Sequence, residues 1–273
     1  MRMASIILGA ALLFFIASCE NEQGKAIPEK SSSSHVTESR LQVVSGTGDQ
    51  VVVSRSLGFG SINAAPYGTF TEKKQIEIFT QAVQSADKMQ GRLDVSQPDY
   101  DIVIMQGRKQ WEIHLWIDAR NAHGMYTYVS DTGTGYKLTT ESTSDLYNLI
   151  WGIRYDSKQA ATNGDFVNAR NKLSNLDIWE KFVTNVKVGV KDEIQVVQYT
   201  IEGGPIFDNL SFDGETIRHM YDNTHDQYGT PTKCLEFCKS IDEIKTDRGT
   251  EYKLSSCGES FVGELMFNLL LLK

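Results

Sequence analysis

The stretch YDIVIMQGRKQWEIHLWI at 100–117 decides the fold class. Two apolar runs flank Gly107, and this arrangement is typical of two strands joined by a turn. From Trp111 onward, every second residue is large and apolar, while His114 and its alternate neighbours point to the opposite face. We expect one face of this sheet to be buried and the other, with His114, to be solvated, as in an antiparallel sheet.

Helical spacing of apolar residues appears on both sides of these strands. Residues 72–86 are expected to form a helix with Thr71 as its cap. A second helix is expected behind the capping-box spacing of Ser142 and Asp145. Between the two helices, the glycines of DTGTGYK at 131–137 are expected in a turn.

The second half of the chain repeats this plan without obvious sequence identity. Asn175 is expected to cap a helix, and EIQVVQYTI at 193–201 predicts a strand. The dipeptide Asp213-Gly214 predicts a tight hairpin turn, and the segment around Gly249 predicts another.

Both halves therefore predict an α+β fold of two small domains, each a mostly antiparallel sheet with packed helices. The polar, non-periodic segment DSKQAATNG predicts the join, so we expect domains at 41–157 and 158–273. The apolar end of the chain, FVGELMFNLLLLK, is too short to span a bilayer and predicts a buried strand or short helix.

Residues 1–18 have the pattern of a secretory signal peptide: Arg2, an apolar run, then small residues. Ile16, Ala17, Ser18 and Cys19 resemble the bacterial lipobox. The resemblance implies a diacylglyceryl group on Cys19, whereas the alternative is an ordinary signal peptide that contains a cysteine. Two or more acyl chains anchor a protein stably, at about 0.8 kcal/mol per buried methylene. The prediction is a protein anchored through acylated Cys19 to the cell membrane, facing the extracytoplasmic side, which a palmitate label would mark.

Residues 19–40 contain KSSSSH and little that is apolar, so we expect a flexible tether. The whole chain has 273 residues, of which 40% are hydrophobic, as in a globular protein. Without the signal peptide, 26 basic residues face 35 acidic ones, a net charge of about −9. An acidic chain binds polyanions poorly, which disfavours nucleic acid as a partner.

Two family resemblances cover most of the expected folded part. Residues 43–154 resemble the YhfM-like domain found in lipoproteins of Gram-positive spore formers, above all in QPDYDIVIMQGRKQWEIHLWI and YKLTTESTSDLYNLI. Residues 164–263 resemble the domain of unknown function numbered forty-three sixty-two, in NGDFVN, in the run from LDIWEKF to HDQYG, and in CKS and SSC. The resemblances imply a bacterial lipoprotein with these two domains, and neither family supplies an activity.

The chain has four cysteines, and three remain after Cys19. Export favours disulfides. Cys238 and Cys257 match the pattern of the second family and bracket the second hairpin, which implies a bridge between them. Cys234 is then the odd thiol, or it pairs with Cys238 instead. A zinc site on these cysteines is a weak alternative, because no histidine lies close to them in the sequence.

One polar cluster is a candidate for metal chemistry. His219, Asp222, His225 and Asp226 crowd together in RHMYDNTHDQYG, and Asp213 lies across the expected hairpin. Imidazoles and carboxylates are metal ligands, but the spacing matches no liganding loop. The simpler interpretation is a polar turn in which Asp222 bonds its own backbone. We expect no metal, no cofactor and no catalytic residues, because the chain has no nucleophile elbow, Walker loop or HExxH motif.

Two classes of function follow. The first is a non-catalytic module that binds an envelope protein or a ligand. The second is a metal-dependent envelope hydrolase that uses the cluster from His219 to Asp226. We expect the first, because the chain lacks a recognisable catalytic motif, and stoichiometric binding of a divalent ion would separate the two.

Overall fold

The hairpin around Gly107 is confirmed in the computed structural model of the chain. The structure describes residues 48–118, 122–170, 172–258 and 267–273. Strand β4 (Tyr100–Gln106) pairs antiparallel with β5 (Lys109–Trp116), and Gly107 and Arg108 make the turn. Gly107 has a φ of 58°, a left-handed conformation that glycine adopts without steric cost.

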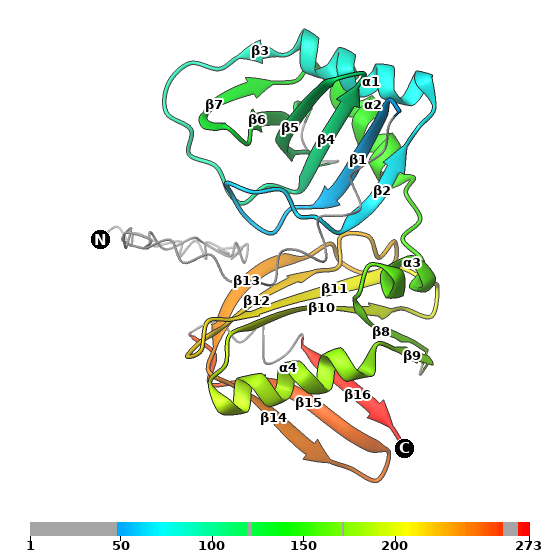
Figure 1. The fold of residues 1–273 in the computed structure, drawn as a ribbon, viewed down its shortest axis with the longest axis vertical. Helices are drawn as coiled ribbons and strands as arrows, with labels where there is room; N and C mark the ends of the chain where they lie inside the picture. The colour runs from blue at the N-terminus through cyan, green and yellow to red at the C-terminus, as the bar shows by residue number, and fades with distance from the viewer. Residues whose placement is uncertain (1–47, 119–121, 171, 259–266) are drawn as a thin grey trace, which may run out of the picture. The chain divides into compact units, whose positions relative to one another are not determined.

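These two strands belong to a seven-stranded antiparallel sheet with the order β2-β1-β4-β5-β6-β7-β3 (Figure 1). The other strands of this sheet are β1 (Gln50–Arg55), β2 (Pro66–Phe70), β3 (Asp87–Lys88), β6 (Met125–Tyr128) and β7 (Asp131–Lys137).

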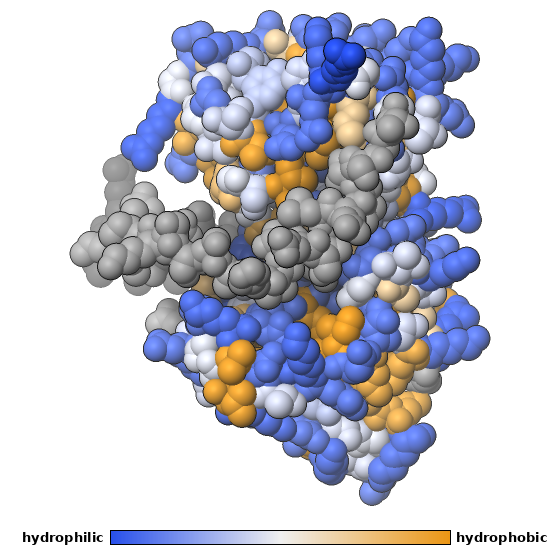
Figure 2. Space-filling view, in the orientation of Figure 1, coloured by the Kyte–Doolittle hydropathy of each residue, from blue (hydrophilic) through white to orange (hydrophobic). Residues whose placement is uncertain are grey.

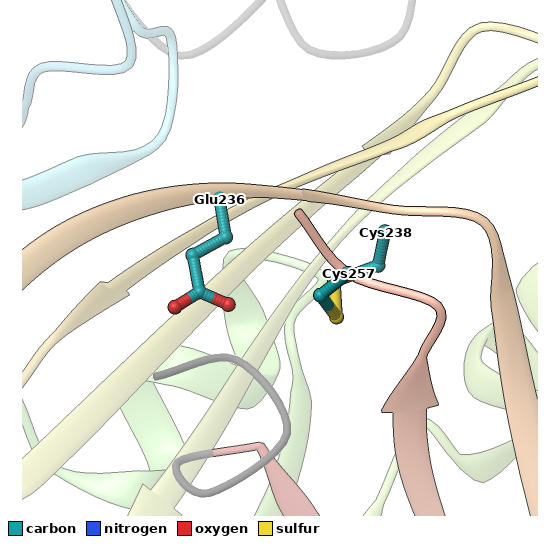
Figure 3. Close-up of side chains that lie close together, drawn as sticks. All are labelled: Glu236, Cys238 and Cys257. Carbon is teal, nitrogen blue, oxygen red and sulfur yellow. A yellow bond between two sulfur atoms is a disulfide. The ribbon is translucent and has the colours of Figure 1, made fainter. Parts of the chain in front are cut away.

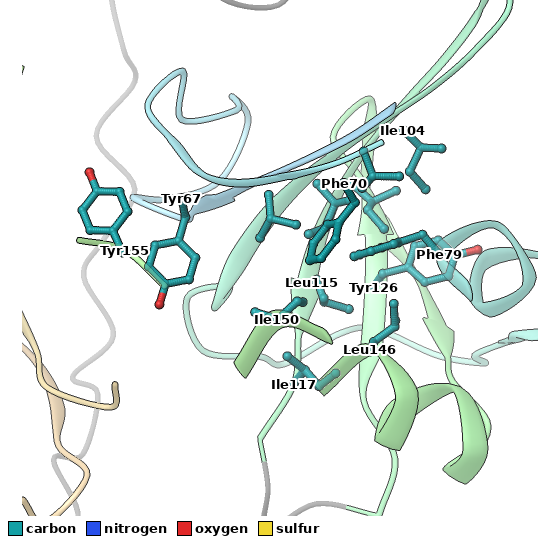
Figure 4. Packing of buried hydrophobic residues seen from close by; sticks show 14 of the residues in the cluster. Tyr67, Phe70, Phe79, Ile104, Leu115, Ile117, Tyr126, Leu146, Ile150 and Tyr155 are labelled. Carbon is teal, nitrogen blue, oxygen red and sulfur yellow. The ribbon is translucent and has the colours of Figure 1, made fainter. Parts of the chain in front are cut away.

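Helices α1 (Lys73–Ser85) and α2 (Thr140–Trp151) contribute to the hydrophobic core of this sheet. Figure 4 shows Phe79 of α1 and Leu146 of α2 in the same cluster as Leu115 of β5. Full burial of an apolar side chain of this size stabilises a fold by about 1.5 to 3 kcal/mol, so this shared cluster holds the helices on the sheet.

The expected caps of both helices are wrong. Glu72, not Thr71, occupies the N-cap position of α1, and its side chain makes no capping hydrogen bond. The cap of α2 is Thr139, whose Oγ1 accepts a hydrogen bond of 3.0 Å from the backbone N–H of Ser142. Each helix begins in a polar run with several residues able to cap, so spacing alone does not select one.

Two segments that we expected to be irregular are regular elements. DTGTGYK forms strand β7, so the expected turn is wrong. A Cβ atom at Gly135 would lie 2.7 Å from Cδ2 of Leu93, which means that glycine permits close packing here rather than a turn. The expected join contains helix α3 (Ser157–Thr162), whose cap Asp156 accepts from the N–H of Gln159. A helix this short shows too few turns for a periodic pattern.

The second half of the chain forms a six-stranded sheet with the order β13-β12-β11-β10-β8-β9 (Figure 1). Strands β8 and β10 are parallel, and helix α4 (Leu176–Val188) lies in the crossover that a parallel pair requires. The hairpin at Asp213-Gly214 is confirmed as the connection between β11 and β12. The strands are β8 (Phe166–Ala169), β9 (Lys172–Ser174), β10 (Asp192–Tyr199), β11 (Pro205–Phe212), β12 (Ile217–Asp222) and β13 (Lys233–Cys238).

The C-terminal strands form a separate three-stranded sheet, which the sequence did not indicate. Its strands are β14 (Ser240–Lys245), β15 (Gly249–Ser255) and β16 (Asn268–Leu272). The hairpin at Gly249 is confirmed. Side chains of both sheets and of α4 share a second core, in which Trp179 lies 5.7 Å from the Phe267 ring.

The first hydrophobic core continues into the six-stranded sheet. Val197 and Phe207 belong to the same buried cluster as Val51 and Leu115. All described residues fall in one compact unit, Ser34–Lys273. The fold is α+β with mostly antiparallel sheets, as expected.

Candidate functional site

A buried arginine joins the seven-stranded sheet to the six-stranded sheet. Arg55 ends β1, and its Nη2 donates to Oδ2 of Asp222 at 2.8 Å. Its Nη1 donates to Oδ1 of Asn209 at 3.0 Å, and its Cζ lies 3.9 Å from the centre of the Phe207 ring. The side chains of the ion pair are 4% and 6% exposed, so both charges are withdrawn from water.

His225 lies beside this ion pair, between two tyrosines. Its Nδ1 is 2.9 Å from the hydroxyl of Tyr67, and its Nε2 is 2.8 Å from the hydroxyl of Tyr100. Its ring stacks on Trp151 at a centroid distance of 5.2 Å. A neutral imidazole has one N–H and one lone pair, so one tyrosine accepts, the other donates, and both nitrogens are satisfied.

Burial and charge set the ionisation of this cluster. Burial lowers the pKa of His225 to about 4, and the Asp222 carboxylate offsets this only in part. Burial alone raises the pKa of Asp222, but Arg55, Lys233 and hydrogen bonds from Thr224 outweigh it, so that the pKa lies well below its usual range. Near neutral pH, the cluster therefore holds one cation, one carboxylate and a neutral imidazole.

The space beside Arg55 is too small for a substrate. It has a volume of about 10 Å³ and is lined by Arg55, Tyr67, Tyr155 and Gln195, among others. This volume is about that of one water molecule. The cluster therefore connects two sheets and has no room for a reacting molecule.

The expectation that His114 is solvated is wrong. His114 is fully buried, and its Nδ1 donates to Oδ1 of Asp101 at 2.8 Å. Its Nε2 accepts from the backbone N–H of Gly60 at 3.2 Å, while Oδ2 of Asp101 accepts from the N–H of Asn63 at 2.8 Å. The connection between β1 and β2 thus folds over this face of the sheet, and strand alternation alone does not reveal such a cover.

The residues named for a metal-dependent hydrolase do not form one set of ligands. Asp222 and His225 both lie in the cluster around Arg55, whereas His219, Asp226 and Asp213 are bonded separately. Nε2 of His219 lies 2.8 Å from Oδ1 of the buried Asp208. Asp213 and Asp226 accept backbone N–H groups in two different turns, and Oδ1 of Asp222 accepts from the N–H of Thr224, as in the expected polar turn.

The disulfide between Cys238 and Cys257 is present, and Cys234 is buried and not part of it. Figure 3 shows the carboxylate of Glu236 beside the two sulfurs. A carboxylate oxygen and both sulfurs lie within 4.8 Å of one another, a potential metal-ligating group in the described part of the chain. Glu236 was not among the residues predicted from the sequence, although alternate residues of CLEFC lie on one face of a strand, a pattern that could have indicated it.

A shallow hollow of about 270 Å³ lies at the edge of β5, lined by Gln110, Trp111, Glu112, Tyr128 and Ser130. In the register of β6 on β5, Tyr128 is the last residue paired, so β5 extends past the end of its neighbour. The face of the molecule in Figure 2 is mostly hydrophilic, with separate hydrophobic patches. The hollow offers partly exposed aromatic surface to a ligand.

Cys19, the signal peptide and the tether lie outside the described residues, so lipidation stays a prediction. Within the described ranges, none of the helices combines the length and the apolar character needed to cross a bilayer.

Two family models match the chain. Residues 61–156 match the family described as YhfM protein, and residues 163–253 match the domain of unknown function DUF4362. No curated protein and no solved structure matches it. The chain therefore carries a YhfM segment followed by a DUF4362 segment, in the order that the sequence resemblances predicted.

Proposed function

We propose that the protein is a lipid-anchored surface lipoprotein whose folded part is a non-catalytic binding or interaction module at the cell envelope. The observation that carries this proposal is the engagement of the buried histidines. His114, His219 and His225 are each buried and each bonded to a side chain of the protein. A general acid or base must reach its substrate, directly or through one water, and these imidazoles lie beneath the surface.

The extracytoplasmic, membrane-anchored location rests on the order of charge, apolar run, small residues and Cys19 in the sequence. A tether of 19–40 reaches on the order of 25 Å if it is flexible. The folded part then stands away from the bilayer, where a partner has access to its sides.

The hollow at Trp111 and Tyr128 is the surface that we assign to binding. Both aromatic side chains are partly exposed and pack against the core, so they are held in place before a ligand arrives. Rigid aromatic side chains supply much of the affinity at binding surfaces. Gln110, Glu112 and Ser130 add polar groups around them.

Metabolic labelling with a palmitate analogue tests the anchor. We expect the wild-type protein to be labelled and to stay with the membrane fraction. Cys19→Ala should lose both properties, while Cys234→Ala, the matched control, should keep them. An unlabelled wild type or a labelled Cys19→Ala would contradict the anchor.

Photocrosslinking on intact cells tests the binding role. A photoreactive residue at Ser130, on the rim of the hollow, is expected to capture a discrete envelope component. The same residue at the exposed Glu215, in the β11–β12 turn, is the control and should not capture it. Equal capture at both positions would exclude the hollow as the binding surface. Capture at Ser130 that is undiminished by Trp111→Ala would exclude it as well.

A divalent-ion titration of the disulfide-bonded protein tests the catalytic alternative. We expect no stoichiometric binding at 219–226, because each of these side chains is already engaged elsewhere. Binding of one ion that is lost in His225→Ala would favour the hydrolase instead.

A further inference from the structure

On the inner face of β13, a cysteine of the disulfide lies beside an acidic side chain. Cys238 is fully buried, Glu236 is 4% exposed, and both lie on the same face of the strand because they are two residues apart. Cys257 completes the group, with one potential ligand atom from each residue within 4.8 Å of the others (Figure 3). We propose that reduction of the Cys238–Cys257 disulfide opens a zinc site formed by Cys238, Cys257, Glu236 and His219.

His219 is the fourth ligand because of its register and its free nitrogen. It lies directly opposite Glu236 in the β12–β13 pairing, and directly opposite residues have Cβ atoms about 4.5 to 5.5 Å apart. Its Nδ1 is buried and has no hydrogen-bond partner within the described residues. His219 lies beside the group formed by Glu236, Cys238 and Cys257 and is not part of it. A shift of the His219 side chain would therefore bring Nδ1 into place as the fourth ligand of a tetrahedral site.

The second shell of such a site is already assembled. Nε2 of His219 donates to the buried carboxylate of Asp208 at 2.8 Å. A histidine that binds a metal usually donates its other N–H to a carboxylate, which fixes the tautomer and raises the basicity of the liganding nitrogen. In this tautomer, Nδ1 carries the lone pair that a metal requires.

The chemistry is a two-electron exchange followed by metal binding. A thiolate of a dithiol reductant attacks one sulfur of the bridge, and its second thiolate then releases the protein as two thiols. Two electrons and two protons pass to the protein, and the reductant leaves as a disulfide. Zinc binding then displaces the two thiol protons to solvent. Cys257 is partly exposed and its neighbours Ser256 and Gly258 are exposed, so a reductant has access.

Thiolates, imidazole and carboxylate are the ligands that zinc takes in tetrahedral sites. The disulfide and the metal exclude each other, since a sulfur in the bridge has no thiolate to offer. The bound metal therefore reports the redox state around the protein.

The test uses the full chain in detergent, reduced with a phosphine and freed of excess reductant without oxygen. We expect the reduced protein to bind one Zn²⁺ per chain, and Co²⁺ to give the visible spectrum of a tetrahedral thiolate site. The oxidised protein should bind neither ion there, and reoxidation should release the zinc. Reduced wild type that binds no metal would overturn the proposal.

A variant that lacks both cysteines can fail to fold for reasons unrelated to zinc, so the ligands are also tested by single substitutions. Glu236→Gln and His219→Gln should each weaken zinc binding by at least about tenfold, and Asp208→Asn by about 10- to 100-fold. Cys234→Ser is the matched control and should bind as the wild type does. Wild-type affinity in both ligand variants, or loss of binding in Cys234→Ser, would show the assignment to be wrong.

Discussion

Arg55 and Asp222 form a buried ion pair of 2.8 Å although 167 positions separate them in the chain. The pair connects β1 of the first sheet to the end of β12 in the second. It lies next to the part of the hydrophobic core where Phe207 meets Tyr67. The two sheets are therefore joined by charge as well as by apolar contact.

Arg55→Met should lower the free energy of unfolding by about 3 to 5 kcal/mol, because it leaves the Asp222 carboxylate buried without a counter-ion. Denaturation by urea at pH 7 measures this. The control is Lys73→Met, which removes an exposed ion pair with Glu77 and should cost less than about 1 kcal/mol. Equal losses in the two variants would contradict a structural role for the buried pair.

Stability should fall as the pH is lowered from about 6.5 to about 4. The unfolded chain protonates His225 near pH 6.5, whereas burial lowers the pKa of the folded residue to about 4. The unfolded state binds more protons in this window, so the free energy of unfolding decreases with falling pH, by about 3 kcal/mol. Urea denaturation at pH 7 and at pH 4.5 measures the slope.

His225→Phe should flatten this slope, since the variant has no imidazole to protonate. His123→Ala is the control, because His123 is exposed, and it should keep the wild-type slope. Below about pH 4, stability should fall further, because the lowered pKa of Asp222 stabilises the fold only while the carboxylate stays ionised. A slope in His225→Phe as steep as in the wild type would count against the assignment to His225.

Asp101→Asn should loosen the β1–β2 connection without unfolding the sheet. The two oxygens of the Asp101 carboxylate accept separately from His114 and from the N–H of Asn63. An amide has only one acceptor oxygen, so one of the two hydrogen bonds is lost and the other is no longer assisted by charge. Hydrogen exchange at the amides of Gly60 and Asn63 should become faster. The control is Glu112→Gln, on the same face of β5 as His114, and it should leave the exchange rates of both amides unchanged. Unchanged exchange rates in Asp101→Asn would contradict this account.

Removal of the disulfide by Cys238→Ser with Cys257→Ser should lower the free energy of unfolding by about 3 kcal/mol, the loop-closure contribution for cysteines 19 positions apart. Non-reducing peptide mapping should find the 238–257 link in the wild type. Cys234→Ser should keep that link, and a peptide joining 234 to 257 would show the pairing to be wrong.

Local features of the fold were predictable from the sequence. The turn at Gly107 and the hairpin at Asp213-Gly214 depend on a few adjacent residues and on alternation, and both are present. Asn175 occupies the N-cap position of α4, as expected, although its side chain makes no capping hydrogen bond. The caps of α1 and α2 were not predictable, because neighbouring residues such as Thr139 and Ser142 are both acceptable N-cap residues and tertiary packing chooses between them. The parallel pairing of β8 with β10 depends on a crossover of many residues, which leaves no local pattern.

The buried polar groups were predictable only in part. The Cys238–Cys257 bridge followed from the family pattern. A single arginine in the apolar run VVVSR was a signal for a buried cation, but its partner on β12 was not visible at such a separation. His114 is buried because the connection between β1 and β2 covers it. Its place on the same strand face as Glu112 and Trp116 was therefore misleading.

The YhfM match begins at residue 61, yet β1 lies between β2 and β4 in the sheet and ends before that residue. A fragment cut where similarity begins would lose an interior strand together with Arg55. The backbone groups of β2 and β4 that pair with β1 would be left unpaired, and such exposed strand edges are prone to pair with another copy of the fragment. Residues 61–156 expressed alone are therefore expected to aggregate, because the folded sheet needs a strand that lies before the match.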